Sequence, residues 1–384
     1  MNNIANDNLH LPPVTNRGAI SAIKDGVFLL FDWVQATLFI DFKNYGIYDL
    51  FFHLFRVNRY DVLLDAIPPL FGYSHSYSYR HLVIFVSDDR EDMGYHIYLT
   101  GQGCRDLEDS NISYVELFNK LYEFNCHFTR VDVSFDNFTN KYFNLDRIKR
   151  CINNKEVVTK FRHSLQFIKE DLDSLNNIGF TIWFGSRASD IQFVFYDKLK
   201  ERIYNANKEI DSDIQYWNRL EMRFRNEKAD TIIYNYMFCS NFNQYILGII
   251  NNKISFRIKS LSNSQRCRWQ YHKWWNDFID NVPKIKFQSV PIEYSISKKR
   301  SWLDHTCSYS SFCVLMADIK DFTTDDIFSR YLYEFFLKGS KKLSEKDLQY
   351  INQFRIKNNL VPISYSEVND FIKNIKDIII KMNK

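Results

Sequence analysis

Apolar and polar side chains alternate along seven segments in the first two thirds of the chain. Alternation with a period of two is typical of a strand that packs one face on a core. We therefore predict strands over Val27–Asp41, Arg80–Asp88, Tyr95–Thr100, His127–Asn137, Phe180–Arg187, Ile191–Asp197 and Trp217–Arg225. Gly185–Asp190 separates two of these strands and is predicted to be a hairpin turn.

Helical spacing appears between some strands and again near the C-terminal end. Ser113 and Glu116 form a capping box ahead of an apolar stripe, and Leu145, Ile148 and Ile152 indicate a second helix. Beyond about residue 250 the period becomes helical, and we predict helices over Thr324–Phe336, Ser344–Arg355 and Ser366–Met382. The order predicts an α+β fold: a mainly antiparallel sheet with helices packed on one face, followed by a helical C-terminal part.

The second face of four predicted strands carries charged and hydrogen-bonding side chains. A solvated sheet face explains any one strand, but four strands with both carboxylates and arginines favour a functional concave face. Carboxylates can hold a hard divalent metal ion and arginines bind phosphate oxygens, so this face suits phosphate chemistry. Its members are Arg130, Asp132, Ser134 and Asp136; Arg219, Glu221, Arg223 and Arg225; His96, Tyr98 and Thr100; and Gln192, Tyr196 and Lys198.

Positive charge is concentrated in one stretch of the chain. The whole chain has a formal net charge of +4, yet residues 251–308 contain eleven Lys or Arg and four Asp or Glu. That stretch carries +7 and the remainder −3. Either a phosphate-backbone partner or an ordinary solvated surface accounts for such a bias.

Cysteine usage and hydropathy limit the class of protein. Seven cysteines, an odd number with no CxxC pair, argue against a disulfide framework and a zinc site, and favour a cytoplasmic location. No signal peptide opens the chain, whose first 24 residues are polar. The longest apolar run, 27–42, is interrupted by Asp32, Gln35 and Asp41, so we expect a soluble protein with no membrane partner.

Several ordered blocks make the chain resemble the replication initiation factor family. This family comprises staphylococcal-type rolling-circle plasmid Rep proteins, filamentous-phage replication proteins and relaxases of integrative conjugative elements. The blocks are DWVQATL (32–38), GYHIYLTGQGCRDLE (94–108), FTRVDVSFDNF (128–138), TIWFGSRASDIQFVFYDKLKE (181–201) and WNRLEMRFR (217–225), with Trp274, Trp275 and Phe278 downstream. The ordered set covers roughly residues 26 to 305.

The resemblance implies a nicking tyrosine in the F-Y-D-K element, which is Tyr196 here. It implies a metal near Asp132 and Glu221, with Asp32 as a third candidate ligand. Two positions depart from the family's pattern: Val194 replaces a residue that is often basic or polar, and Trp183 one that is often tyrosine. The chain has no His-x-His pair, in agreement with the family.

The implied reaction is transfer of a DNA strand to a tyrosine. Mg²⁺ or Mn²⁺ would polarise the scissile phosphate, and Lys198 or Arg219 would neutralise charge on the transferring group. Attack by Tyr196 would leave a 5′-phosphotyrosine and a free 3′-hydroxyl. If Tyr196 is not the nucleophile, Tyr204 is the next candidate.

The resemblance also implies a division of the chain. Residues 1–25 are predicted to be a flexible leader, 26–250 the nicking and strand-transfer domain, and 251–384 a basic, then helical, DNA-binding region. Origin-duplex contacts are expected in the basic stretch, and the polar face and hairpin turn add further arginines. The predicted DNA-binding residues are Arg130, Arg187, Arg223, Arg257, Lys259, Arg266, Arg268 and Lys273.

Some residues admit a structural explanation. Asp132 and Glu221 would also serve as ion-pair partners of the neighbouring arginines. His96 is expected to be a buried, hydrogen-bonded histidine rather than a metal ligand. Gly101-Gln102-Gly103 is too short for a phosphate loop and is predicted to be a turn, and Trp274 and Trp275 are expected in the core.

Two classes of function remain open from the sequence. The first is a nicking enzyme: a rolling-circle replication initiator, or a conjugative relaxase with the same chemistry. The second is a non-catalytic DNA-binding regulator on the same fold. The chain has too few residues before its first strand for an N-terminal helix-turn-helix, which disfavours one relaxase branch. Expected partners are double-stranded origin DNA and its nicked strand, with a host helicase and a second copy of the chain implied by the family.

Overall fold

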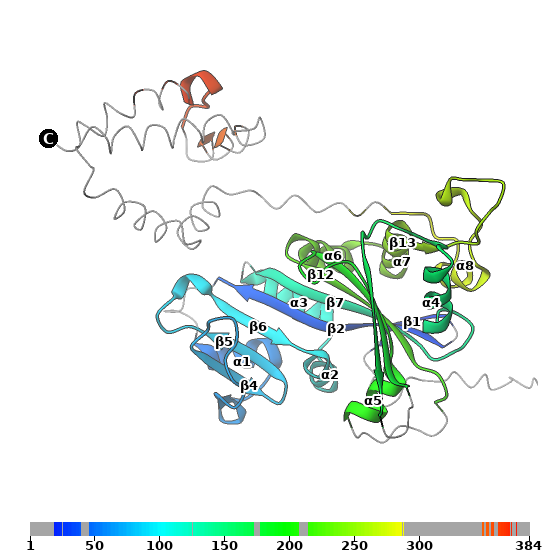
Figure 1. Cartoon of the computed structure of the whole chain (residues 1–384). Helices are drawn as coiled ribbons and strands as arrows, with labels where there is room; N and C mark the ends of the chain where they lie inside the picture. Colours follow the sequence, from blue (N-terminus) through cyan, green and yellow to red (C-terminus); the bar gives the residue numbers. More distant parts are fainter. Residues whose placement is uncertain are drawn as a thin grey trace, which may run out of the picture. The chain divides into compact units, whose positions relative to one another are not determined.

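The structure is a computed structural model that describes residues 19–24, 26–39, 46–124, 126–172, 177–206, 214–285 and 287, with scattered residues between 348 and 374. The chain divides into two compact units, Met1–Val290 and Pro291–Lys384. The first unit carries the sheet and helices labelled in Figure 1. Most of the predicted C-terminal helices lie outside the described residues; Ser364 and Glu367 there form a reciprocal cap on a turn at 365–368.

An 11-stranded sheet organises the first unit. Its order is β3-β4-β5-β6-β2-β7-β12-β11-β10-β9, and β1 also pairs with β2. Neighbouring strands in this sheet are antiparallel. The strands are β1 (Ala19–Lys24), β2 (Val27–Leu38), β3 (Leu63–Leu64), β4 (His75–Tyr79), β5 (Leu82–Val86), β6 (Tyr95–Leu99), β7 (His127–Asn137), β9 (Ser164–Glu170), β10 (Asn177–Phe184), β11 (Ile191–Asp197) and β12 (Asn218–Arg225).

All seven predicted strands are present, because each has an apolar row that the fold buries. In β7 the row Val131, Val133 and Phe135 is fully buried, as are Leu220, Met222 and Phe224 in β12. Gly185 begins the predicted hairpin turn with φ of 95°, a conformation that glycine adopts without a Cβ clash. The α+β class and the antiparallel sheet are therefore confirmed. The predicted leader includes β1.

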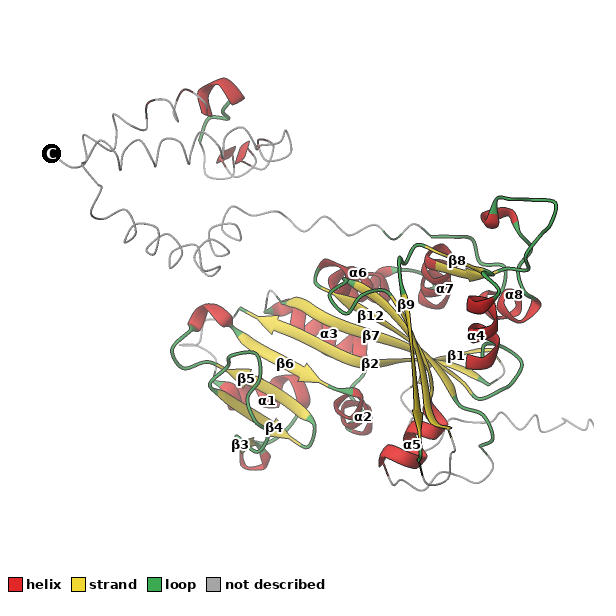
Figure 2. Cartoon of the chain, viewed as in Figure 1, coloured by secondary structure: helices red, strands yellow, loops and turns green. Residues whose placement is uncertain are grey.

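Helices cover the apolar face of the sheet, as Figure 2 shows for α3 beside β7. Ser113 caps α3 by accepting a hydrogen bond from the Glu116 amide at 3.1 Å, which confirms the capping box. Helix α6 packs on β7 and β12, and α4 packs on β10 and β11. The helices are α1 (Ile47–Phe55), α2 (Gly101–Asp109), α3 (Tyr114–Glu123), α4 (Leu145–Asn153), α5 (Lys198–Ala206), α6 (Glu227–Phe238), α7 (Phe242–Lys253) and α8 (Lys273–Ile279).

Two expectations about local structure are wrong. Gly101-Gln102-Gly103 opens helix α2 rather than forming a turn, because the Thr100 hydroxyl caps the Gly103 amide and Leu107 packs in the core. The helical region also starts before residue 250, at α6, because buried residues such as Ile232 and Ile246 recur at helical spacing in α6 and α7.

A β-bulge in β2 shapes the polar face. Phe31 pairs with Val133 and Trp33 with Asp132, so Asp32 is the extra residue between them. A bulge of this kind lets two successive side chains turn toward the same face. Asp32 and Trp33 both line the cavity on that face.

A small second sheet pairs β8 (Val157–Thr159), from the middle of the first unit, with β13 (Ile254–Phe256), nearer its C-terminal end. Trp275 is fully buried against Phe256, and Trp274 packs on the same core, as predicted. In the described residues no helix is long and apolar enough to cross a bilayer. The cysteines in that part, Cys104, Cys126, Cys151, Cys239 and Cys267, are free thiols.

Candidate active site

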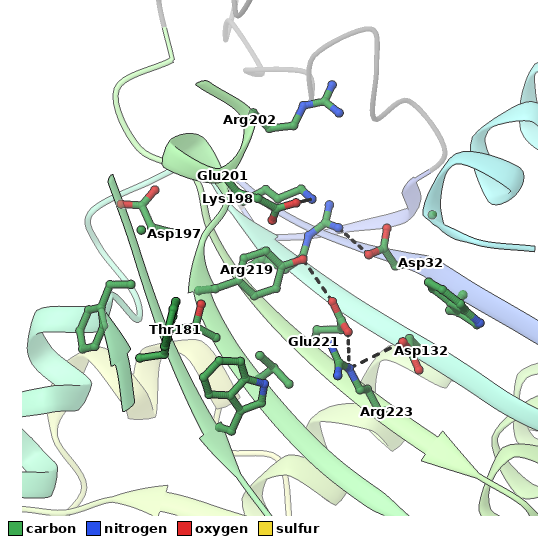
Figure 3. Close-up of a pocket in the computed structure, with 18 of the residues that line it drawn as sticks. Asp32, Asp132, Thr181, Asp197, Lys198, Glu201, Arg202, Arg219, Glu221 and Arg223 are labelled. Carbon is green, nitrogen blue, oxygen red and sulfur yellow. Dashed lines mark hydrogen bonds and ion pairs between the residues drawn. The ribbon is translucent and has the colours of Figure 1, made fainter. Parts of the chain in front are cut away.

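A cavity of about 460 Å³ opens on the polar face of the sheet. Its floor comes from β2, β7, β12, β11 and β10, and residues of α2 and α5 form part of its wall. Asp197 accepts a hydrogen bond from the Lys200 amide at 2.9 Å, which starts α5 directly after β11. Figure 3 shows Asp32, Asp132, Arg219, Glu221 and Arg223 gathered in this cavity.

The strand register brings the predicted residues together. Asp136 pairs with Arg219, and Arg219 pairs with Tyr196, so one row crosses β7, β12 and β11. Because side chains alternate between the two faces, the next row on this face contains Glu221, which pairs with Ser134. Asp132 pairs with Arg223 on the next row but one. The polar face predicted from the sequence is therefore present across β7, β12 and β11.

Tyr196 is half-buried, and its hydroxyl donates a hydrogen bond to Glu221 Oε2 at 3.1 Å. Burial raises the pKa of Tyr196 well above 10, against the opposing effect of the Arg219 charge. The ammonium of Lys198 lies 5.5 Å from the centre of the tyrosine ring. The phenol is therefore protonated at rest and has a carboxylate in place to accept its proton.

Two acidic residues share one arginine. Arg223 Nε lies 2.6 Å from Glu221 Oε1 and 3.9 Å from Asp132 Oδ2, as the dashed lines in Figure 3 indicate. Asp132 is 1% exposed, and burial together with the Glu221 charge raises the pKa of Asp132 to about 7. Two buried carboxylates therefore face each other across one cation.

Arg219 links a second pair of carboxylates and is 1% exposed. Its Nε and Nη2 donate to the two oxygens of Asp136 at 2.6 and 2.7 Å, and Nη1 donates to Asp32 at 2.7 Å. Burial alone would raise the pKa of Asp32, but the charges of Arg219, Lys198 and Arg105 lower it below 3.8. The guanidinium is thus held rigidly beside the tyrosine.

Arg130 lines the cavity together with Trp33. Its guanidinium lies 4.2 Å from the centre of the Trp33 ring, and its Nε donates to Asp132 at 3.0 Å. The sequence did not indicate this stacking, because it depends on the bulge that turns Trp33 to the polar face. Asp136 was likewise given no role, although its position four residues after Asp132 in the same strand placed it on the polar row.

The carboxylates do not form a compact three-ligand group as they stand. In the described part of the chain, the group whose ligand atoms all lie within 4.8 Å of one another is Cys151, Glu156 and His272. None of these three lines the cavity. The hydrogen bonds of Asp32, Asp132 and Glu221 are made mainly to arginines and Tyr196.

The remaining predicted DNA-binding residues lie outside the cavity. Arg187 is exposed in the hairpin turn between β10 and β11. Arg257 is 5% exposed; it donates from Nε to the Ser255 hydroxyl and stacks on Tyr271. Its guanidinium therefore packs inside this end of the unit. The other predicted DNA-binding residues of the basic stretch, Lys259, Arg266, Arg268 and Lys273, are exposed.

His96 agrees with its predicted structural role. It is 6% exposed, its Nδ1 lies 3.0 Å from the Thr37 hydroxyl oxygen, and its ring stacks on Phe85 and Tyr73. Burial lowers the pKa of His96 to about 4.

Comparison with known proteins gives two family matches that follow one another along the chain. Residues 126–331 match the model of the family described as replication initiation factor. Residues 29–123 match the rolling circle replication initiation protein N-terminal domain.

A curated relative and a solved structure are also similar to this chain. The putative DNA relaxase NicK of Bacillus subtilis (strain 168) is 26% identical over 322 residues, which cover 81% of this chain and 89% of that protein. The structure of a rolling circle replication initiator protein from Geobacillus stearothermophilus is 26% identical, with a TM-score of 0.59. That match covers 69% of this chain and 99% of the other.

Proposed function

The chain belongs to the replication initiation factor family, and on this premise we propose that it nicks one strand of origin DNA with Tyr196 as nucleophile. The observation that carries the proposal is the hydrogen bond from the Tyr196 hydroxyl to Glu221 beside the buried Arg219. A rolling-circle initiator and a conjugative relaxase would use the same chemistry. Names of both kinds occur among the relatives.

In the proposed step, Glu221 accepts the phenolic proton while Tyr196 Oη attacks the scissile phosphorus. A general base must lie within hydrogen-bond reach of the proton it removes, and 3.1 Å meets that condition. The bond from phosphorus to the 3′-oxygen breaks, and that oxygen takes a proton from water. The products are a 5′-phosphotyrosine and a free 3′-hydroxyl, and reversal of the step rejoins the strand.

Arg219 and Lys198 are two cations that act on Tyr196. Arg219 lowers the pKa of Tyr196 against the effect of burial, and so favours negative charge on the phenolic oxygen as the bond forms. Because Asp136 and Asp32 hold its guanidinium, little reorganisation is needed when charge develops. Lys198 supplies a second positive charge near the tyrosine ring.

Asp132 and Glu221 would hold a divalent metal ion, with Asp32 as a further ligand. The fit rests on the buried pair itself: hard oxygen donors on both residues already approach one cation, Arg223. Mg²⁺ or Mn²⁺ bound there would polarise the scissile phosphate. Binding would require Arg223 to move away from Glu221.

The direct test is to incubate the full chain with supercoiled DNA of the encoding element, with Mg²⁺ or with EDTA. Metal-dependent nicking and a nucleotide-bearing peptide that contains Tyr196 are expected. Tyr196→Phe should form no adduct, whereas Tyr204→Phe, in the exposed part of α5, should retain it.

Other results would contradict parts of the proposal. An adduct that persists in Tyr196→Phe means that another nucleophile acts. Binding without nicking on DNA that contains the true origin favours the regulator instead. Equal nicking rates in EDTA and in Mg²⁺ would show that the reaction needs no metal ion.

A further inference from the structure

The cavity face of the sheet continues past Tyr196 onto two outer strands. Tyr196 pairs with Thr181 of β10, and Thr181 pairs with Phe167 of β9. In the adjacent row, Val194 pairs with Trp183, and Trp183 with Leu165. These rows share one face, because paired residues in antiparallel strands point to the same side.

The outer part of this face is apolar. Leu165 and Phe167 are 60% and 54% exposed, and the Phe167 ring lies 6.3 Å from that of Trp183. Phe167, Trp183 and Val194 line the same cavity as Tyr196. We call Leu165, Phe167, Trp183 and Val194 the shelf.

The shelf contains both positions at which the sequence departs from the family's pattern. Val194 and Trp183 are cross-strand partners, so the two departures change one continuous surface. Exposed apolar side chains grouped beside a charged pocket indicate a ligand that is partly apolar and partly charged.

We propose that the shelf binds unpaired bases of the strand being cut, next to the scissile phosphate; this rests on the proposed function. Bases stack on aromatic side chains whatever their sequence, while the phosphates follow a positively charged groove. Lys169, two residues after Phe167 on the same face, lines the cavity and contributes such a charge. The strand thus passes from Phe167 and Trp183 to the arginines around Tyr196.

A second copy of the chain is the competing occupant, because β9 ends the sheet order. The shelf favours DNA because it shares the cavity of the nucleophile. Pairing through the β9 edge would involve the backbone of that strand rather than one of its faces. Ile168 provides the comparison: it is 41% exposed and lies on the opposite face of β9.

The test compares full-length Phe167→Ala with Ile168→Ala. The first probe is fluorescent oligothymidylate, whose binding does not depend on nicking. Phe167→Ala should weaken binding about 5- to 150-fold, the effect of one stacked base. Ile168→Ala should stay within about twofold of the unsubstituted chain. Equal affinities in the two variants overturn the proposal.

The second probe is the nick-site oligonucleotide with one abasic residue at a time. The unsubstituted chain should lose affinity at one or two positions beside the scissile phosphate, and Phe167→Ala should lose nothing further there. Additive losses overturn the proposal. A change from dimer to monomer in Phe167→Ala, measured by light scattering with DNA affinity unchanged, assigns the shelf to an interface between copies. If the unsubstituted chain fails to nick, the proposed function fails, while the oligothymidylate comparison still decides the shelf.

Discussion

A conservative substitution of Glu221 separates its two proposed roles, proton acceptor for Tyr196 and metal ligand. Glu221→Gln keeps an oxygen near the Tyr196 hydroxyl but cannot accept its proton. We expect the nicking rate to fall roughly 10²- to 10⁴-fold, as for loss of a general base, with DNA affinity unchanged. The measurement is single-turnover nicking together with oligonucleotide binding.

Glu227→Gln is the matched control for that substitution, because Glu227 is exposed in the first turn of α6 and does not line the cavity. Its nicking rate should stay close to that of the unsubstituted chain. If higher metal concentration restores the nicking rate of Glu221→Gln, weakened metal binding explains the loss, and the proposed proton transfer to Glu221 is wrong.

His96 gives a prediction about stability and pH. Its pKa in the folded chain is about 4, below the ordinary value of 6.5, because burial disfavours the charged imidazole. As the pH falls below 6.5 the unfolded chain binds this proton first, so the free energy of unfolding decreases until about pH 4. The contribution lost is about 3 kcal/mol. His96→Phe should therefore flatten the pH dependence of urea unfolding across this range.

Thr37→Val is the control for His96→Phe. It removes the hydroxyl that contacts His96 Nδ1 but keeps the imidazole, so its pH dependence should match that of the unsubstituted chain. Parallel curves for His96→Phe and the unsubstituted chain would show that His96 does not cause the acid destabilisation.

At the scale of elements, α2 connects packing to the cavity. A Cβ added to Gly103 would lie 2.5 Å from the carbonyl oxygen of His81, so Gly103→Ala must displace the helix. We expect a loss of about 1–3 kcal/mol in the free energy of unfolding. Nicking should also slow, since Gly101 and Arg105 of α2 line the cavity. Urea unfolding and nicking rates measure both effects.

Gly179→Ala tests whether any added methyl group near the cavity has this effect. Its Cβ would lie 3.5 Å from that of Lys169, an ordinary contact. Stability should therefore change little. An equal decrease in the free energy of unfolding in Gly103→Ala and Gly179→Ala would show that the close packing of α2 is not the cause.

The elements predicted from the sequence are those in which local pattern and burial agree. His127–Asn137 and Ile191–Asp197 match their strands residue for residue, because apolar and polar residues alternate through most of each segment. Strand β9 was missed because it exposes Leu165 and Phe167 and so has no buried row. Helix α2 was missed because its two glycines are poor helix formers, and the Thr100 cap and tertiary packing outweigh that propensity.

For the whole molecule, the polar face could be predicted but its pairing could not. Alternation placed Asp132, Arg219 and Tyr196 on one face once the strands shared a sheet. Which carboxylate meets which arginine depends on strand order and register, which the sequence does not specify locally. The bulge that turns Asp32 and Trp33 to the same side has no sequence signal of its own.

Binding to the origin duplex is a property of the molecule's charge distribution. Lys259, Arg266 and Arg268 are exposed in the basic stretch, whereas the guanidinium of Arg257 is buried. Each phosphate contact releases counterions. A plot of the logarithm of the binding constant against the logarithm of the salt concentration therefore has a slope of about −0.9 per contact. Replacing the three exposed residues with Gln should therefore reduce this slope by about 3.

The control variant replaces Arg59, Arg80 and Arg90 with Gln. These three exposed arginines come from the part of the chain before β6, and the net charge changes by the same amount as in the first triple variant. If phosphate contacts lie in the basic stretch, the control keeps the slope of the unsubstituted chain, because overall charge alone forms no contact. If both triple variants flatten the slope equally, general attraction explains the salt dependence. If neither does, the duplex binds elsewhere, and the arginines around Tyr196 become the surface to test.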